Sequence, residues 1–138
     1  MRIMAIDYGD VRTGVAVSDE TAVLAGETWV LTERNERIVV NHIVDEALKR
    51  GISKIILGYP KNMNGTLGPR AELSEKLAGL IRAKCDIEVI LWDERMTTIS
   101  AHRILTDAGK RGKKRKKTID AVAAALILEN YLDSLKHR

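Results

Sequence analysis

The spacing of apolar residues changes along this chain from the period of a strand to that of a helix, and this change constrains the fold most. Three apolar segments come first, at residues 2–7, 14–18 and 27–31. Each has the length of a strand, and Gly9 and Gly14 bracket the turn between the first two. The pattern predicts an antiparallel meander of three strands.

Helical and strand-like segments alternate from residue 36 onward. Apolar residues recur every three or four positions in residues 36–50 and 70–84, as in helices with one buried face. Residues 52–57 and 87–92 are short and continuously apolar, which is typical of strands that helices cover on both faces. Because such strands pair in parallel through right-handed crossovers, we expect them to extend the sheet beyond the first strand.

Two more helices are predicted at residues 98–108 and 119–135, the second with Thr118 as its N-cap. Between them, Lys110–Lys117 contains seven basic residues and no acidic one, and we expect it to be a flexible loop. The rest of the chain has 16 basic and 19 acidic residues, so the net charge of +4 comes from this segment. Such a patch indicates a phosphate-rich partner.

The composition is that of a globular protein, with 45% hydrophobic and 30% charged residues among 138. We expect a single domain over residues 1–138. The longest apolar stretch, residues 121–128, is too short to cross a membrane, and no signal peptide is recognised at the start. The single cysteine, Cys85, excludes an internal disulfide and a thiolate zinc cluster. These features predict a cytoplasmic location and no membrane partner.

Acidic residues stand at the edges of three apolar segments. Asp7 ends the first strand, Asp93 and Glu94 follow the strand at 87–92, and Asp120 opens the last helix. The carboxyl ends of parallel strands meet at one edge of a sheet, so Asp7 and one residue of the pair are expected to lie together. If the carboxylates converge, they form a site for two divalent cations, which can drive phosphodiester cleavage.

Each acidic residue also has a simpler interpretation. Asp7 belongs to an Asp-Tyr-Gly-Asp sequence, which is typical of a turn. Asp93 or Glu94 can begin the turn into the next helix, with Arg95 neutralising the charge. The helix dipole favours a carboxylate at Asp120. The residues alone leave both interpretations open.

Other polar residues of types that contact phosphate follow predicted strand ends. They are Arg12, Asn62, Asn64, Arg70, Arg95, Thr97 and Thr98. The three histidines are scattered, and no Gly-x-x-x-x-Gly-Lys-Ser/Thr loop occurs. The sequence therefore suggests neither a zinc triad nor a P-loop nucleotidase.

Four motifs occur in order along essentially the whole chain. They are Asp7-Tyr8-Gly9 with Arg12 and Gly14-Val15-Ala16; Gly58-Tyr59-Pro60 with Gly65; Asp93-Glu94-Arg95 with Thr97-Thr98; and Asp120-Ala121 with Ala123-Ala124. Together they resemble the YqgF/RuvX family of bacterial Holliday-junction-resolvase-like nucleases, also described as nucleases of pre-16S ribosomal RNA processing. The resemblance implies an RNase H-like α/β fold, with three antiparallel and two parallel strands in a mixed sheet flanked by helices.

The resemblance also implies that Asp7, Asp120 and one acid of the Asp93–Glu94 pair bind Mg²⁺ or Mn²⁺. We favour Glu94, because it stands last on its strand, and keep Asp93 as the alternative metal ligand. On this interpretation Asp7, Glu94 and Asp120 are catalytic. Position 123 is Ala, where related junction resolvases are expected to carry a second acid, and this leaves a fourth ligand unidentified.

The leading hypothesis is a metal-dependent endonuclease acting on structured nucleic acid, in pre-16S rRNA 5′-end processing, Holliday junction resolution or both. The residues expected to contact the pre-rRNA or branched DNA are Arg12, Arg95, Lys113, Lys114, Arg115, Lys116 and Lys117. The alternative is a non-catalytic RNA- or ribosome-associated module of the same fold. An actin-like kinase or ATPase is disfavoured, because such proteins need two domains. A monomer and a homodimer are both compatible with the sequence.

Overall fold

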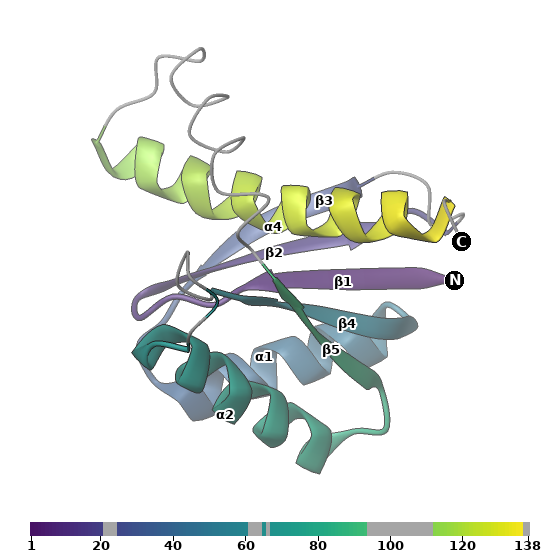
Figure 1. The fold of residues 1–138 in the computed structure, drawn as a ribbon, viewed down its shortest axis with the longest axis horizontal. Helices are drawn as coiled ribbons and strands as arrows, with labels where there is room; N and C mark the ends of the chain where they lie inside the picture. The colour runs from purple at the N-terminus through teal and green to yellow at the C-terminus, as the bar shows by residue number, and fades with distance from the viewer. Residues whose placement is uncertain (21–24, 61–64, 66, 94–111, 137–138) are drawn as a thin grey trace.

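The computed structural model describes residues 1–20, 25–60, 65, 67–93 and 112–136, with the backbone alone for residues 25 and 112–120. In chain order the elements are β1 (Arg2–Asp7), β2 (Arg12–Ser18), β3 (Ala25–Thr32), α1 (Glu36–Lys49), β4 (Ile52–Tyr59), α2 (Pro69–Lys84), β5 (Glu88–Asp93) and α4 (Gly112–Lys136). Figure 1 shows a twisted sheet between two helical layers.

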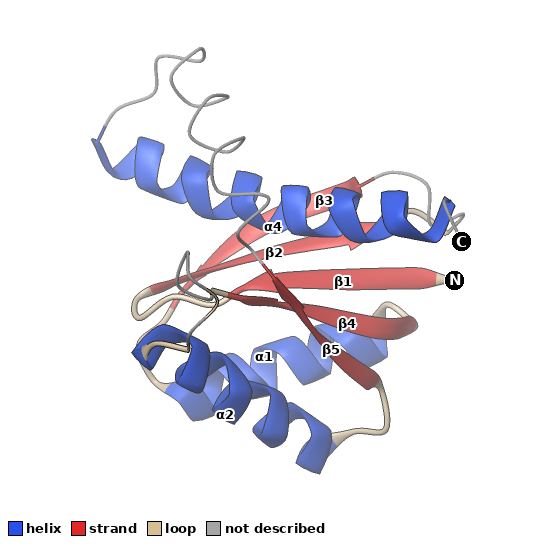
Figure 2. Ribbon diagram, in the orientation of Figure 1, coloured by secondary structure: helices blue, strands red, loops and turns tan. Residues whose placement is uncertain are grey.

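The sheet is mixed, with the strand order β3-β2-β1-β4-β5 (Figure 2). The pairs β1–β2 and β2–β3 are antiparallel, whereas β1–β4 and β4–β5 are parallel. This confirms the predicted meander of three strands and the parallel extension beyond β1. Strands β2 and β4 each have two residues more than predicted, because Arg12 pairs with Thr32 and Tyr59 pairs with Asp93. Pairing partners, rather than apolar character, determine those strand ends.

Two hydrophobic clusters fill the two faces of the sheet. Helices α1 and α2 cover one face, where Met4, Ile6 and Leu57 pack with Ile43 and Leu77. Helix α4 covers the other face, and Figure 1 shows it lying across β1, β2 and β3. Its residues Ala124, Ile127, Leu128, Tyr131 and Leu132 pack there with Ile3, Ala5, Ala16 and Ile56. Burial on both faces explains why β1 and β4 lack a polar alternation.

Helix α1 begins and ends where its sequence predicts. The Asn35 side chain caps it by accepting a hydrogen bond from the backbone N–H of Arg37 at 3.0 Å. Gly51 follows the helix with φ of 67°, a left-handed conformation that glycine adopts without strain. The predicted stop at Gly51 is therefore confirmed.

The start of α4 differs from the prediction. The helix begins at Gly112, so Lys113–Lys117, called the basic segment below, lies in its first turns rather than in a flexible loop. The predicted N-cap at Thr118 is wrong for the same reason. Lysine and arginine are good helix formers, and a helix already packed at Ala124 extends at the gain of one hydrogen bond per residue. No helix within the described residues is long and apolar enough to cross a membrane.

Candidate active site

Asp7 and Asp93 end two strands at the same edge of the sheet, called the carboxyl edge below. Asp7 is the last residue of β1 and Asp93 the last of β5, and β4 runs in parallel between them. Tyr59, at the end of β4, is the Cα partner of Asp93. Parallel strands bring their carboxyl ends together, and this is the edge at which ligands bind in α/β sheets. The expected position of the two strand ends at one edge is confirmed, and β4 separates Asp7 from Asp93.

The two carboxylates belong to opposite faces of the sheet. Asp7 lies two residues after Ala5, which packs against α4. Asp93 lies two residues after Leu91, which packs with the cluster under α1 and α2. Because side chains alternate along a strand, Asp7 belongs to the α4 face and Asp93 to the α1/α2 face.

Helix α4 carries Asp120 toward the face and the edge of Asp7. Ala124 is fully buried against the α4 face, and Asp120 precedes it by four residues, about one helical turn. The backbone of Asp120 therefore lies on the same side of α4 as the backbone of Ala124.

The direction of α4 sets the level of Asp120 along the sheet. The helix runs opposite to β1, so its C-terminal turns lie beside the start of β1 (Figure 1). Lys54 Nζ there donates to Tyr131 Oη at 3.4 Å. From Tyr131 back to Asp120 the helix spans about 16 Å. Strand β1 covers about 13 Å from Ile3, the Cα partner of Lys54, to Asp7. The backbone of Asp120 is thus close to the level of the carboxyl edge.

Two glycines shape the surroundings of Asp7. Gly14 is the Cα partner of Asp7, so no side chain stands beside the carboxylate on β2. At Gly9 a Cβ atom would overlap the carbonyl oxygen of Arg12, and the turn between β1 and β2 can close this tightly only with glycine. The Asp-Tyr-Gly sequence therefore makes a compact turn and also leaves space beside Asp7.

Tyr8 is held from both helices of the α1/α2 layer. Its Oη donates to Glu36 Oε2 at 3.3 Å, and Arg70 Nη2 donates to its backbone carbonyl at 3.4 Å. Lys76 Nζ forms an ion pair with Glu36 Oε1 at 3.1 Å. Partial burial and the neighbouring Glu36 carboxylate raise the pKa of Tyr8 to about 12, so the hydroxyl stays a donor even at pH 10. The sequence indicated Arg70 as a polar residue that follows a predicted strand end but gave no sign of its contact with Tyr8.

A second tyrosine at the carboxyl edge has a similar arrangement. The Tyr59 hydroxyl donates to Glu75 of α2, and this hydrogen bond raises the pKa of Tyr59 to about 12. Helix α2 is thus tied to the ends of both β1 and β4 through its polar side chains.

The structure describes some of the remaining predicted site residues and not others. Arg12 is the half-buried first residue of β2, beside the Gly9 turn. The basic segment forms the first turns of α4. Outside the described residues lie Asn62, Asn64, Glu94, Arg95, Thr97, Thr98, Lys110, Arg111 and the helix predicted at 98–108. Within the described part of the chain, no three His, Cys, Asp or Glu residues form a group that could hold a metal. That part includes neither Glu94 nor the side chain of Asp120.

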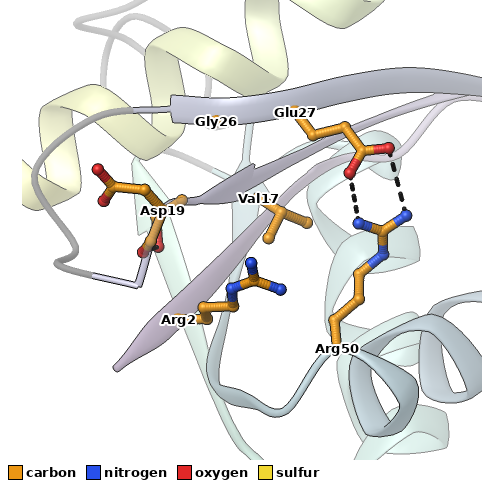
Figure 3. A pocket seen from close by; sticks show the side chains of 7 residues that line it. Arg2, Val17, Asp19, Gly26, Glu27 and Arg50 are labelled. Atoms are coloured by element: carbon orange, nitrogen blue, oxygen red, sulfur yellow. Dashed lines mark hydrogen bonds and ion pairs between the residues drawn. The ribbon is translucent and has the colours of Figure 1, made fainter.

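A cavity of about 210 Å³ opens at the opposite end of the sheet, near the start of β1 (Figure 3). It is lined by Arg2, Val17, Ser18, Asp19, Gly26, Glu27 and Arg50. Arg50 donates to Glu27 at 2.5 Å and to Glu46 at 2.9 Å, which lowers the pKa of both carboxyls. None of the candidate acids lines this cavity, so it is not part of the candidate active site.

Solved structures with this fold include enzymes that resolve DNA junctions. Thermus thermophilus RuvC in complex with a Holliday junction substrate matches with a TM-score of 0.63 at 13% identity, over 99% of this chain and 96% of that chain. The fowlpox virus resolvase, in complex with Holliday junction DNA, matches with a TM-score of 0.58 at 13% identity, over 98% and 99% of the two chains. At this identity the likeness establishes the fold. The chain has the RNase H-like fold of the resolvases, as predicted.

The sequence comparisons identify the family. The profile described as "RuvX: Holliday junction resolvase" matches residues 1–134. A relative from Geobacillus kaustophilus is 48% identical, over 97% of this chain and 99% of its own length. One from Bacillus subtilis is 43% identical, over 98% and 99%. Both carry the name "Putative pre-16S rRNA nuclease". The chain belongs to the RuvX family, and its predicted class, a phosphodiester-cleaving hydrolase, is confirmed with the family.

Proposed function

We propose that this protein is a metal-dependent endonuclease that cleaves structured RNA, with pre-16S rRNA as its substrate. The observation that carries this proposal is the convergence of β1 and α4. Asp7 ends β1 on the face that α4 covers, and α4 brings the backbone of Asp120 to the same face near the same edge. These two acids come from the first strand and the last helix, so the approach of their backbones depends on the folded chain.

The residues that would hold Mg²⁺ or Mn²⁺ are Asp7, Glu94 and Asp120. Carboxylate oxygens are the ligands such hard cations prefer, and Gly14 leaves space beside Asp7. The position of Asp93 on the opposite face of β5 supports Glu94 as the acid contributed by that motif. Two bound cations would supply Lewis-acid activation of the attacking water and of the leaving oxygen.

The basic segment and Arg12 would hold the nucleic-acid backbone. Lys117 precedes Asp120 by only three residues, about 4.5 Å along α4. A phosphate backbone that contacts the first turns of α4 therefore passes close to the carboxyl edge. Arg12 begins β2 at this same edge, and Arg95 follows Glu94 in the sequence. Because such contacts read charge rather than base sequence, they fit recognition of a structured strand by its shape.

The choice of RNA rests on the relatives. Those named "Putative pre-16S rRNA nuclease" share 42–48% identity with this chain over nearly its full length. The resolvases solved with junction DNA share only 13%. The cytoplasmic location stays a prediction. The same holds for the oligomeric state, which is predicted to be a monomer or a homodimer.

The test is a cleavage assay with two substrates. The purified protein is incubated with end-labelled pre-16S rRNA or four-way junction DNA, in Mg²⁺, in Mn²⁺ or in EDTA. We expect cleavage of the RNA with either cation and none in EDTA. Asp7→Asn keeps the shape of the side chain and removes its charge, so it should abolish cleavage and leave RNA binding largely intact. Asp86→Asn, an exposed carboxylate near the start of β5, is the control and should cleave normally.

Each other outcome has a defined meaning. Cleavage by Asp7→Asn at the wild-type rate would refute the metal site. Cleavage of junction DNA but not of RNA would refute the substrate. Binding without cleavage by the wild-type protein, lost when the basic segment is neutralised, would instead favour the non-catalytic RNA-binding module.

A further inference from the structure

We propose that Glu36 and Arg70, acting on Tyr8, form a clamp that positions Asp7 for metal binding. This inference rests on the proposed function, because it assigns positioning residues to the same site. The three residues, called the Tyr8 clamp, come from three elements: the turn after β1, the start of α1 and the start of α2.

The clamp acts where the sheet no longer holds the chain. The β1–β2 ladder ends with the pair Asp7–Gly14, so Tyr8 is the first residue beyond it. Its side chain is held by Glu36 at 3.3 Å and its backbone carbonyl by Arg70 at 3.4 Å. Asp7 is therefore followed by a residue that forms hydrogen bonds at two separate atoms. A shift of Tyr8 would change the backbone dihedrals of Asp7 and so redirect its carboxylate.

Both partners of Tyr8 are attached to rigid parts of the fold. Glu36 is the first residue of α1, directly after the capping residue Asn35, and Lys76 of α2 balances its charge at 3.1 Å. Arg70 is the second residue of α2, between Pro69, which presets the first helical φ, and the fully buried Ala71. The clamp thus links the position of Asp7, on the α4 face of the sheet, to the α1/α2 layer on the other face.

The clamp also accounts for two hydrogen bonds of Tyr8 that have no direct role in the proposed chemistry. Arg70 is exposed at the start of α2, and its Nη2 donates to the backbone carbonyl next to a candidate ligand at 3.4 Å. Glu36 and Tyr8 are 28 residues apart, and their hydrogen bond has no role in capping α1, which Asn35 performs. Partners that orient a metal ligand typically change metal affinity 10- to 100-fold when removed.

The test measures Mn²⁺ affinity by calorimetry, together with the melting temperature of the metal-free protein. Arg70→Gln and Tyr8→Phe should each weaken Mn²⁺ binding by about tenfold. Arg70→Gln should leave the melting temperature nearly unchanged, and Tyr8→Phe should stay folded at the temperature of the titration. Arg70→Lys keeps a cationic donor and should restore part of the affinity. The double variant of Arg70→Gln and Tyr8→Phe should lose less than the product of the single effects, because both act on one residue.

A matched control lies on the same helix. Arg82, near the other end of α2, donates to the backbone carbonyl of Val89 in β5 at 2.7 Å. Arg82→Gln removes the same kind of contact far from the carboxyl edge, so it should leave Mn²⁺ affinity unchanged whatever its effect on stability. Equal Mn²⁺ affinity in Arg70→Gln, Arg82→Gln and the wild-type protein would overturn the clamp alone. No Mn²⁺ binding by the wild-type protein would overturn the proposed function and the clamp with it.

Discussion

Replacing Gly9 by alanine tests whether the close turn after β1 is needed to place Asp7. The new methyl group would overlap the carbonyl oxygen of Arg12, a backbone atom that can move only with the turn itself. Overpacking of this kind costs about 1–3 kcal/mol, and the smaller entropy of the unfolded alanine chain offsets roughly 0.4–1 kcal/mol of it. We therefore expect Gly9→Ala to lower the free energy of unfolding by about 1–2 kcal/mol.

The control is the same substitution at a glycine whose surroundings leave space for a methyl group. Gly79 lies exposed within α2, and a Cβ there meets no atom within 4 Å. Gly79→Ala should raise the free energy of unfolding by about 0.5–1 kcal/mol, as expected for a glycine inside a helix. The same substitution thus has opposite signs at the two sites, because only one site lacks space.

The assay is urea unfolding followed by circular dichroism, without metal, and then Mn²⁺ titration. A loss of 1–2 kcal/mol corresponds to a fall in melting temperature of roughly 3–8 °C for a chain of this size. Gly9→Ala should also weaken Mn²⁺ binding, whereas Gly79→Ala should not. If Gly9→Ala were as stable as the wild-type protein and bound Mn²⁺ equally well, the turn would be shown to relax freely, and the argument from the overlap would be wrong.

Three further predictions concern Asp93, the basic segment and Tyr8. Asp93→Asn should leave Mn²⁺ affinity within about twofold of wild type, because Asp93 belongs to the face opposite Asp7, and a loss as large as that of Asp7→Asn would contradict this assignment. Neutralising the five residues Lys113–Lys117 should flatten the salt dependence of RNA binding by roughly three to four units of log–log slope, measured by filter binding, and an unchanged slope would exclude contact with phosphates. The pKa of Tyr8 is raised from 10.0 to about 12, so its contribution to stability is complete below pH 10 and is lost as the pH rises toward 12. Tyr8→Phe should therefore weaken the alkaline loss of stability seen in urea midpoints between pH 10 and 12, and an unaltered pH profile would count against the raised pKa of Tyr8.

The element order could be predicted because it depends on local patterns. The strand-length segments, the helical periodicity of α1 and α2, and the glycine after α1 all express preferences of neighbouring residues. The start of α4 could not be predicted in this way. A run of seven basic residues in Lys110–Lys117 is compatible with a loop or a helix, and packing further along the helix decides for the helix from Gly112 onward.

The contacts around Tyr8 could not be predicted either. Its partners Glu36 and Arg70 lie 28 and 62 residues away, and neither forms a motif with it. The sequence indicated Arg70 only as one of several polar residues that follow predicted strand ends. A hydrogen bond to a backbone carbonyl leaves no trace in the identity of the residue that accepts it.

The sequence by itself determined the class of fold and which acids are candidates, because apolar periodicity and residue type are local properties. Tertiary structure decided how those acids are arranged. The parallel register of β1, β4 and β5 brings Asp7 and Asp93 to one edge, and the alternation of side chains separates them onto two faces. The direction of α4 across the sheet then sets which face and which level Asp120 approaches. These relations depend on how distant segments pack, and free energy of packing is a property of the whole sheet rather than of any one motif.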